Sequence, residues 1–201
     1  MDPPYAAVVL AGGAARRMGG QAKPELLLAG RRLLDRVLDA VPDAEPRIVV
    51  GPALGVPAGV RQIQEEPPGG GPVAGLAAAL ALVPTAWLVL LAADLPFLTA
   101  AVIRTLLTSA AGRDGALLTD DTGRDQLLIS ALSVPALAAA LSRLPSVDGA
   151  PLHRVLGRLD VARVSWQVAP GTPPPWWDCD RVEDLEQARR WIAASTEGGP
   201  A

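Results

Sequence analysis

Lys23 is the only lysine in a chain with 18 basic residues, so arginine fills every other basic position. It follows the stretch LAGGAARRMGGQA, residues 10–22, in which an apolar run ends in glycines and two arginines. A glycine-rich turn exposes backbone N–H groups that can surround phosphate oxygens, and a lysine beside it supplies a point charge. The stretch therefore predicts binding of a nucleoside triphosphate.

The spacing of this stretch matches neither of two common phosphate-binding motifs. The pattern G-x-x-x-x-G-K-[ST] is missing, since Pro24 follows Lys23, and the dinucleotide pattern G-x-G-x-x-G is missing from the turn. A tight turn between a strand and a loop, with its arginines in solvent, accounts for the same residues. The glycines alone leave both interpretations open.

A second candidate is Asp94, which ends the apolar stretch WLVLLAAD, residues 87–94. A carboxylate next to such a strand costs free energy unless it faces solvent or a cation. Mg²⁺ prefers a few carboxylate oxygens together with substrate phosphates, so Asp94 is a candidate magnesium ligand. The alternative is that Asp94 only begins the turn before the next helix.

Both candidates must be held by a framework of alternating strands and helices. Short β-rich runs alternate with Ala/Leu-rich stretches at helical spacing, which is typical of βαβ units around a mostly parallel sheet. We expect strands at 5–12, 47–51, 60–66 and 87–94, and helices at 32–41, 73–83 and 99–111, the last with Thr99 as N-cap. Ligands of such sheets bind beyond the carboxyl ends of the strands, so the turns after the first, third and fourth strands are expected to form the site.

The second half of the chain is less regular. Residues 114–132 predict two antiparallel strands around the polar turn DDTGR. We expect helices at 134–143, 151–158 and 181–195, and a strand at 161–168. The whole chain, 1–201, is predicted to be one domain, with about 196–201 as a disordered tail.

Composition limits the choice of partners and of cellular location. A net charge of −3 and a pI near 5.2 give no basic field that would draw the protein to nucleic acid or a membrane surface. The single cysteine, Cys179, cannot form an intrachain disulfide, and the first residues, MDPPY, do not resemble a secretory signal. We therefore expect a cytoplasmic protein without nucleic-acid or membrane partners.

Four stretches together resemble the molybdenum cofactor guanylyltransferase family, within the MobA-like nucleotidyltransferases. They are LAGGAARRMGGQAKPELLLAGRRLLDRVL, EEPPGGGPVAGLAAAL, LAADLPFLTAAVI and DCDRVEDLEQAR, and they occur in the family's order between about residues 6 and 192. The resemblance implies a three-layer Rossmann-like α/β fold. It also implies transfer of GMP from GTP to the phosphate of molybdopterin, the organic part of the molybdenum cofactor, with Mg²⁺ as cofactor and pyrophosphate as by-product.

The resemblance also implies site residues. Leu10, Ala11, Gly12 and Gly13 match the family's nucleotide-binding LAGG, which favours guanine over cytosine, because related cytidylyltransferases tend to have TAAG there. Lys23 matches the triphosphate lysine and Asp94 the Mg²⁺ aspartate, while Glu66 falls near an acidic position of the nucleotide pocket. The implied partners are therefore GTP and molybdopterin, with transient contact to enzymes that accept the finished cofactor.

The implied chemistry needs little acid–base catalysis, because a phosphate monoester is already anionic at neutral pH. Lys23 and a cation on Asp94 would neutralise charge on the transferring phosphate. Arg16 and Arg17 could bind the outgoing phosphates or the acceptor, with exposure to solvent as the alternative. This chain departs from some relatives at Gly51, and at Asp178 and Asp180, where they carry asparagines. These departures make Asp180 a secondary metal candidate and leave the acceptor less certain than the nucleotide.

Other residues have a structural explanation beside the functional one. His153, on a predicted helix, is expected at the surface, and Trp176 and Trp177 are expected to pack, with stacking on a pterin as the alternative. Arg124 and Gln126 belong to the predicted hairpin and could face the acceptor. Two other functions remain open: a cytidylyl- or other nucleotidyltransferase for a different small phosphate, and a nucleotide-binding module without catalysis.

Overall fold

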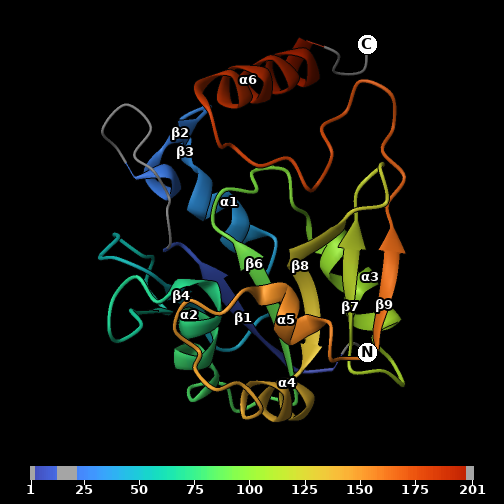
Figure 1. Ribbon diagram of the computed structural model, residues 1–201. Coiled ribbons are helices and arrows are strands. Elements are labelled where there is room, and N and C mark those ends of the chain that lie inside the picture. The colour runs from blue at the N-terminus through green and yellow to red at the C-terminus, as the bar shows by residue number, and fades with distance from the viewer. Residues whose placement is uncertain (1–2, 13–21, 198–201) are drawn as a thin grey trace.

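The computed structural model describes residues 3–12 and 22–197 (Figure 1). Its main sheet is built from β1 (Tyr5–Leu10), β4 (Arg47–Val50), β5 (Val60–Ile63), β6 (Trp87–Ala92), β7 (Gly115–Thr119), β8 (Asp125–Ser133) and β9 (Val161–Ser165). The order across the sheet is β5-β4-β1-β6-β8-β7-β9, and among these strands only β8 runs antiparallel to its neighbours. The predicted mostly parallel sheet with an antiparallel addition is confirmed.

The central strands β1 and β6 are apolar at every position, with sequences YAAVVL and WLVLLA. They pair in parallel, with Val8 opposite Leu90. Continuous apolar sequence is typical of parallel strands that are covered by helices on both faces, because neither face meets water. Side chains alternate between the faces, so Ala7 and Val9 belong to one buried cluster and Val8 to the other.

Helices cover both faces of the sheet. One face carries α1 (Leu33–Asp39) and α3 (Ala100–Ser109), and the other carries α2 (Gly71–Leu80), α4 (Val134–Leu141) and α5 (Leu152–Leu156). This arrangement gives the three layers expected for a Rossmann-like fold. The cap of α3 is as predicted, since Thr99 Oγ1 accepts a hydrogen bond from the Val102 backbone N–H at 3.5 Å.

A third apolar cluster lies at the end of the sheet toward which β7 and β9 point, where α6 (Val182–Glu197) crosses the molecule (Figure 1). It joins α6 to the hairpin of β2 (Leu27–Leu28) and β3 (Arg31–Arg32) through buried residues including Leu28, Leu33 and Leu185. The sequence did not predict this hairpin. Its two-residue turn places both Ala29 and Gly30 at positive φ, 51° and 76°, a turn usually signalled by Asn-Gly or Asp-Gly.

Five parallel strands end earlier than predicted, all at the carboxyl edge. The predicted strands 5–12, 47–51, 60–66, 87–94 and 161–168 leave the regular ladder after Leu10, Val50, Ile63, Ala92 and Ser165. The residues beyond these ends form loops there. In contrast, α6 continues to Glu197, into the predicted tail, and residues 198–201 lie outside the described chain.

Candidate active site

A cavity of about 350 Å³ opens at the carboxyl ends of β1, β4 and β6. Residues from both halves of the chain line it: Leu10, Ala11, Gly12, Lys23, Pro24, Val50, Glu65, Gly71, Pro72, Gly75, Ala92, Ala93, Asp94, Leu95, Gln126, Leu128, Ile129, Trp176, Asp178 and Asp180. The turns after the first, third and fourth predicted strands all contribute. Lys23 and Asp94, 71 positions apart in the sequence, therefore reach the same cavity.

Lys23 is 7% exposed and begins the 3₁₀ turn η1 (Lys23–Glu25). Its Nζ donates a hydrogen bond to Asp180 Oδ1, which is also an ion pair. A buried ammonium needs such a partner or an anionic ligand, because removing it from water is costly. The charge of Lys23 is thus available at the cavity, in contact with a carboxylate that is itself 58% exposed in its side chain.

The backbone after Lys23 is anchored to α1. The Leu33 N–H donates to Leu26 O at 3.0 Å, and Arg36 Nη2 donates to Leu28 O at 2.8 Å. These bonds fix the chain on both sides of the β2–β3 turn. They hold the segment that carries Lys23 against a helix of the main fold.

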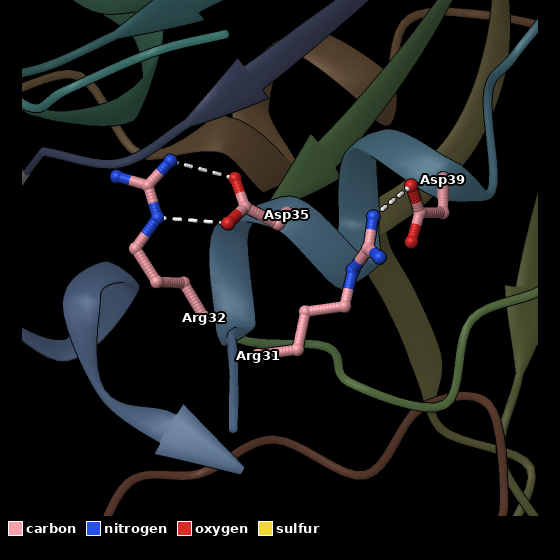
Figure 2. Close-up of polar contacts among 4 residues, drawn as sticks. All are labelled: Arg31, Arg32, Asp35 and Asp39. Atoms are coloured by element: carbon pink, nitrogen blue, oxygen red, sulfur yellow. Dashed lines mark hydrogen bonds and ion pairs between the residues drawn. The ribbon is translucent and has the colours of Figure 1, made fainter. Parts of the chain in front are cut away.

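Two ion pairs join the hairpin to the same helix (Figure 2). Arg32 makes two bonds to Asp35, from Nε to Oδ2 at 2.8 Å and from Nη2 to Oδ1 at 2.7 Å, and the bonds to this carboxylate raise the pKa of Arg32. Arg31 Nη2 pairs with Asp39 Oδ1 at 2.6 Å. Asp35 lies in the first turn of α1, where a carboxylate also interacts favourably with the helix dipole.

Asp94 lies two residues beyond β6, and its pKa is raised to about 6. Burial is the main cause, and the negative charges of Asp178 and Asp180 add to it, while Lys23 acts in the opposite direction. The Asp94 carbonyl accepts a hydrogen bond from the Cys179 N–H at 3.2 Å, which ties the segment 178–180 to this loop. Desolvation and neighbouring Asp180 and Asp184 also raise the pKa of Asp178.

These carboxylates suit a hard divalent cation. Within residues 3–12 and 22–197, no set of three or more His, Cys, Asp or Glu side chains is grouped so that it could hold a metal ion by itself. Mg²⁺ commonly takes only one or two protein carboxylates and completes its shell with water and substrate phosphates. The raised pKa values of Asp94 and Asp178 are consistent with such a site, because a cation there would favour the charged form of both groups.

The N-terminus of α2 forms another wall of the cavity, through Gly71, Pro72 and Gly75. No side chain caps this helix, and no acidic residue lies in its first turn, so its first N–H groups are suited to an electronegative ligand atom. Gly71 has φ of 85°, which strongly favours glycine.

The presence of glycine at position 51 also has a steric explanation. A Cβ at this position would lie 2.8 Å from both Ala11 C and Gly12 N. A larger side chain, such as the asparagine considered above, would therefore displace the loop after β1. Glycine at this position allows the backbones of the two loops to pack closely.

Of the adjacent acidic residues Glu65 and Glu66, it is Glu65 that lines the cavity, whereas the sequence pointed to Glu66. Glu65 is 6% exposed and its Oε1 accepts a hydrogen bond from the Gly69 N–H at 3.0 Å. Glu66 is exposed and does not line the cavity. Two adjacent acidic residues give no sequence signal for which one turns inward, because that depends on how the loop enters α2.

The remaining predicted residues divide into three groups. Gly13, Arg16 and Arg17 lie outside the described residues. His153 is exposed on α5, as expected. Leu10, Ala11 and Gly12, for which the resemblance implies nucleotide binding, line the cavity.

The two adjacent tryptophans have different environments. Trp177 packs edge-to-face on Trp191, with ring centroids 4.7 Å apart, and its Nε1 donates to the Asp184 carbonyl. Trp176 lines the cavity and is half-buried. Packing and ligand contact were alternatives for the pair, and the structure assigns packing to Trp177 and a place at the cavity to Trp176.

Comparison with known proteins identifies the family. The model of the MobA-like NTP transferase domain matches residues 7–189. The chain belongs to the MobA-like NTP transferase family. A molybdenum cofactor guanylyltransferase from Bradyrhizobium sp. (strain ORS 278) is 34% identical, with 92% of each chain covered, and one from Nitrobacter hamburgensis is 31% identical, with 98% of each covered.

A solved structure of the same family supports the fold. The molybdopterin-guanine dinucleotide biosynthesis protein A from Archaeoglobus fulgidus superposes with a TM-score of 0.72 at 22% identity, covering 94% of this chain and 98% of the other. The Rossmann-like nucleotidyltransferase fold, implied above by resemblance, is thus confirmed for this member of the MobA-like family. No helix in the described part of the chain is long and apolar enough to cross a membrane.

Proposed function

We propose that this protein is a molybdenum cofactor guanylyltransferase, which transfers GMP from GTP to the terminal phosphate of molybdopterin. The observation that carries the proposal is the meeting of Lys23 and Asp94 at one cavity, at the sheet edge where such folds bind ligands. The named relatives at 31–34% identity over nearly the full chain supply the substrate class.

The reaction needs charge neutralisation and alignment. An anionic oxygen of the acceptor phosphate attacks the α-phosphorus of GTP, a new P–O bond forms, and the bond to the bridging oxygen breaks as pyrophosphate leaves. No proton has to be removed from the nucleophile, which agrees with the absence of histidine and free thiol from the cavity lining among the described residues.

Lys23 stabilises the negative charge that develops on the α-phosphate and on the leaving pyrophosphate. Its present partner, Asp180, is mostly exposed, so the ammonium can exchange that carboxylate for a phosphate oxygen without leaving an uncompensated buried charge. Asp94, with Asp178 or Asp180 beside it, would hold Mg²⁺, which supplies further positive charge to the phosphate oxygens.

We expect Glu65 and the N-terminus of α2, which both line the cavity, to select the base. Guanine presents N1–H and its 2-amino group side by side, and a carboxylate such as Glu65 can accept a hydrogen bond from both. Cytosine has acceptors on the corresponding edge, so the same carboxylate would repel it. The uncapped N–H groups of α2 suit the guanine carbonyl oxygen, and together these groups favour GTP over CTP.

We test the proposal by measuring pyrophosphate release with Mg²⁺, molybdopterin and each of GTP, ATP, CTP and UTP. GTP should support turnover, and Lys23→Ala should reduce kcat by about 10²–10³-fold while the folded content stays unchanged by circular dichroism. Turnover with CTP and none with GTP would overturn the guanine assignment. Tight GTP binding without pyrophosphate release, for molybdopterin or other small phosphates, would indicate a binding module.

The proposal also covers the cellular location of the protein and the fate of its product. A cytoplasmic location fits a reaction that consumes GTP, and the product must then pass to enzymes that use the cofactor, which implies transient contact with them. Cell fractionation and co-purification with such an enzyme test these points.

A further inference from the structure

The part of the cavity wall that β8 forms contains a glutamine whose amide is held by an aspartate. Gln126 begins the cavity-facing part of β8, and its Nε2 donates a hydrogen bond to Asp120 Oδ2 at 2.9 Å. Asp120 lies at the turn between β7 and β8. The proposed nucleotide contacts of Glu65 and α2 do not explain this pair, because α2 packs near β4, and two strands, β1 and β6, separate β4 from β8.

Asp120 is fixed by the turn itself. Its Oδ1 accepts hydrogen bonds from the Thr122 N–H at 2.9 Å, the Thr122 hydroxyl at 2.6 Å and the Arg124 N–H at 2.9 Å. These bonds, that of the Thr122 hydroxyl foremost, lower the pKa of Asp120. The carboxylate is therefore ionised at neutral pH and can only accept, so the Gln126 atom that faces it must be the amide nitrogen.

The strand is irregular at the same place. Leu118 of β7 pairs with Gln126, but the next residue back, Leu117, pairs with Ser130, so residues 127–129 of β8 have no partner on β7. Buried Ser130 supports this bulge, since its Oγ donates to Leu127 O at 3.0 Å. Bulges often occur next to active sites, where they change the direction of side chains. Here Gln126, Leu128 and Ile129 all line the cavity.

We propose that Gln126 binds the acceptor through its Oε1, and that Asp120 is the positioning residue that orients this amide. A planar amide whose nitrogen is held on one side presents its oxygen on the other, and no described residue donates a hydrogen bond to Gln126 Oε1. An acceptor oxygen beside the apolar side chains of Leu128 and Ile129 fits the edge of a flat heterocycle that carries N–H or amino donors. The inference rests on the proposed function and names the part of the acceptor, its nitrogen-containing ring, that this end of the cavity recognises.

The test compares KM for the acceptor with KM for GTP. With molybdopterin varied at saturating GTP and Mg²⁺, Gln126→Ala should raise the acceptor KM about tenfold, the effect of one lost hydrogen bond at a partly buried site. The values of kcat and of KM for GTP should change less than about twofold. GTP binding, measured by calorimetry without acceptor, should be unchanged.

The variant Asp120→Asn distinguishes a role of Asp120 in orienting the Gln126 amide from a role in stabilising the hairpin. The asparagine oxygen can still accept from the turn, but its amide group then faces Gln126 as a donor, so the glutamine amide turns over and presents nitrogen to the acceptor. We expect this variant to keep the wild-type melting temperature within about 2 °C, the effect of a change well under 1 kcal/mol, and to raise the acceptor KM as much as Gln126→Ala. Asp120→Asn should add nothing in the Gln126→Ala background.

Thr122→Val is the matched control. It removes the hydroxyl bond to Asp120 Oδ1 and leaves the bond from Gln126 to Oδ2, so the acceptor KM should stay at the wild-type value. An unchanged acceptor KM in Gln126→Ala would refute the inference while the wild type still releases pyrophosphate. Equal increases in KM for the acceptor and KM for GTP, together with a lower melting temperature, would also refute it. Such a result would show that Gln126 only stabilises the structure. If the wild type transfers nothing to molybdopterin, the proposed function itself fails.

Discussion

Replacement of Asp94 by asparagine should stabilise the protein while it removes activity. The carboxylate lies in a partly buried loop, and its burial, together with the negative charges of Asp178 and Asp180, raises its pKa from 3.8 to about 6. A charged group that the native state disfavours costs stability at neutral pH. Asparagine keeps the shape of the side chain without the charge, so this cost should disappear in the variant.

The magnitude follows from the pKa difference. The pKa of Asp94 rises from 3.8 to about 6 in the native state, and each tenfold change in proton affinity is worth about 1.4 kcal/mol. The ionised Asp94 therefore lowers the free energy of unfolding by at most about 3 kcal/mol. The folded state binds the proton more tightly, so this contribution favours folding below about pH 4 and is lost as the pH rises through 6. The variant should therefore match the wild type near pH 4 and exceed it above pH 7.

The assay is urea unfolding of both proteins at several pH values, without GTP or divalent cations. At pH 7.5 the variant should be up to about 3 kcal/mol more stable, or about 6–12 °C higher in melting temperature. Asp43→Asn, an exposed carboxylate outside the cavity, is the control and should give no pH-dependent difference. Addition of Mg²⁺ and GTP should then stabilise the wild type more than the variant.

The reasoning fails if Asp94→Asn is destabilised at pH 7.5, or if its advantage does not decrease toward pH 4. Either result would mean that the native structure already compensates the charge of Asp94. The carboxylate would then be a structural partner in the loop, and the case for a cation site there would be lost.

Three further predictions concern residues that line the cavity or lie close to such residues in the sequence. Glu65→Gln should raise KM for GTP about tenfold and weaken discrimination against CTP, whereas Glu66→Gln, an exposed neighbour, should change neither, as steady-state kinetics with both nucleotides will check. Gly51→Ala should cost about 1–3 kcal/mol in urea unfolding, because its Cβ would lie 2.8 Å from backbone atoms; a loss below 0.5 kcal/mol would contradict the proposed close packing. Trp177→Ala should destabilise the fold by about 3–5 kcal/mol, whereas Trp176→Ala should mainly raise the acceptor KM; the opposite assignment in thermal and kinetic assays would show that the two environments were misjudged.

Much of the framework could be predicted from the sequence, because its central strands and flanking helices have strong local patterns. The apolar runs of β1 and β6 and the antiparallel pair β7–β8 were confirmed. The positions of Lys23 and Asp94 beyond strand ends sufficed to predict that they share one edge, since carboxyl ends of parallel strands meet there.

The parts that could not be predicted depend on distant contacts. The ion pair of Lys23 and Asp180 joins residues 157 positions apart, and nothing local marks them as partners. The β2–β3 turn has Ala29 at positive φ, and its sequence contains no common turn motif. Tertiary hydrogen bonds from Arg36 and Leu33 stabilise the hairpin instead. The bulge in β8 is likewise supported by Ser130, and one serine within the stretch LLISAL does not by itself predict a bulge.

Cys179 lies between Asp178 and Asp180, so the reactivity of its thiol reports on movement of this segment. Its side chain has no exposed surface, and burial raises the pKa of its thiol to about 12, so an alkylating or disulfide reagent should leave the native protein unmodified. Since the chain has a single cysteine, any labelling must come from molecules in which the cluster of Leu28, Leu33 and Leu185 around Cys179 has opened. The rate of thiol modification in native buffer therefore measures how often this cluster opens, with no probe added to the chain.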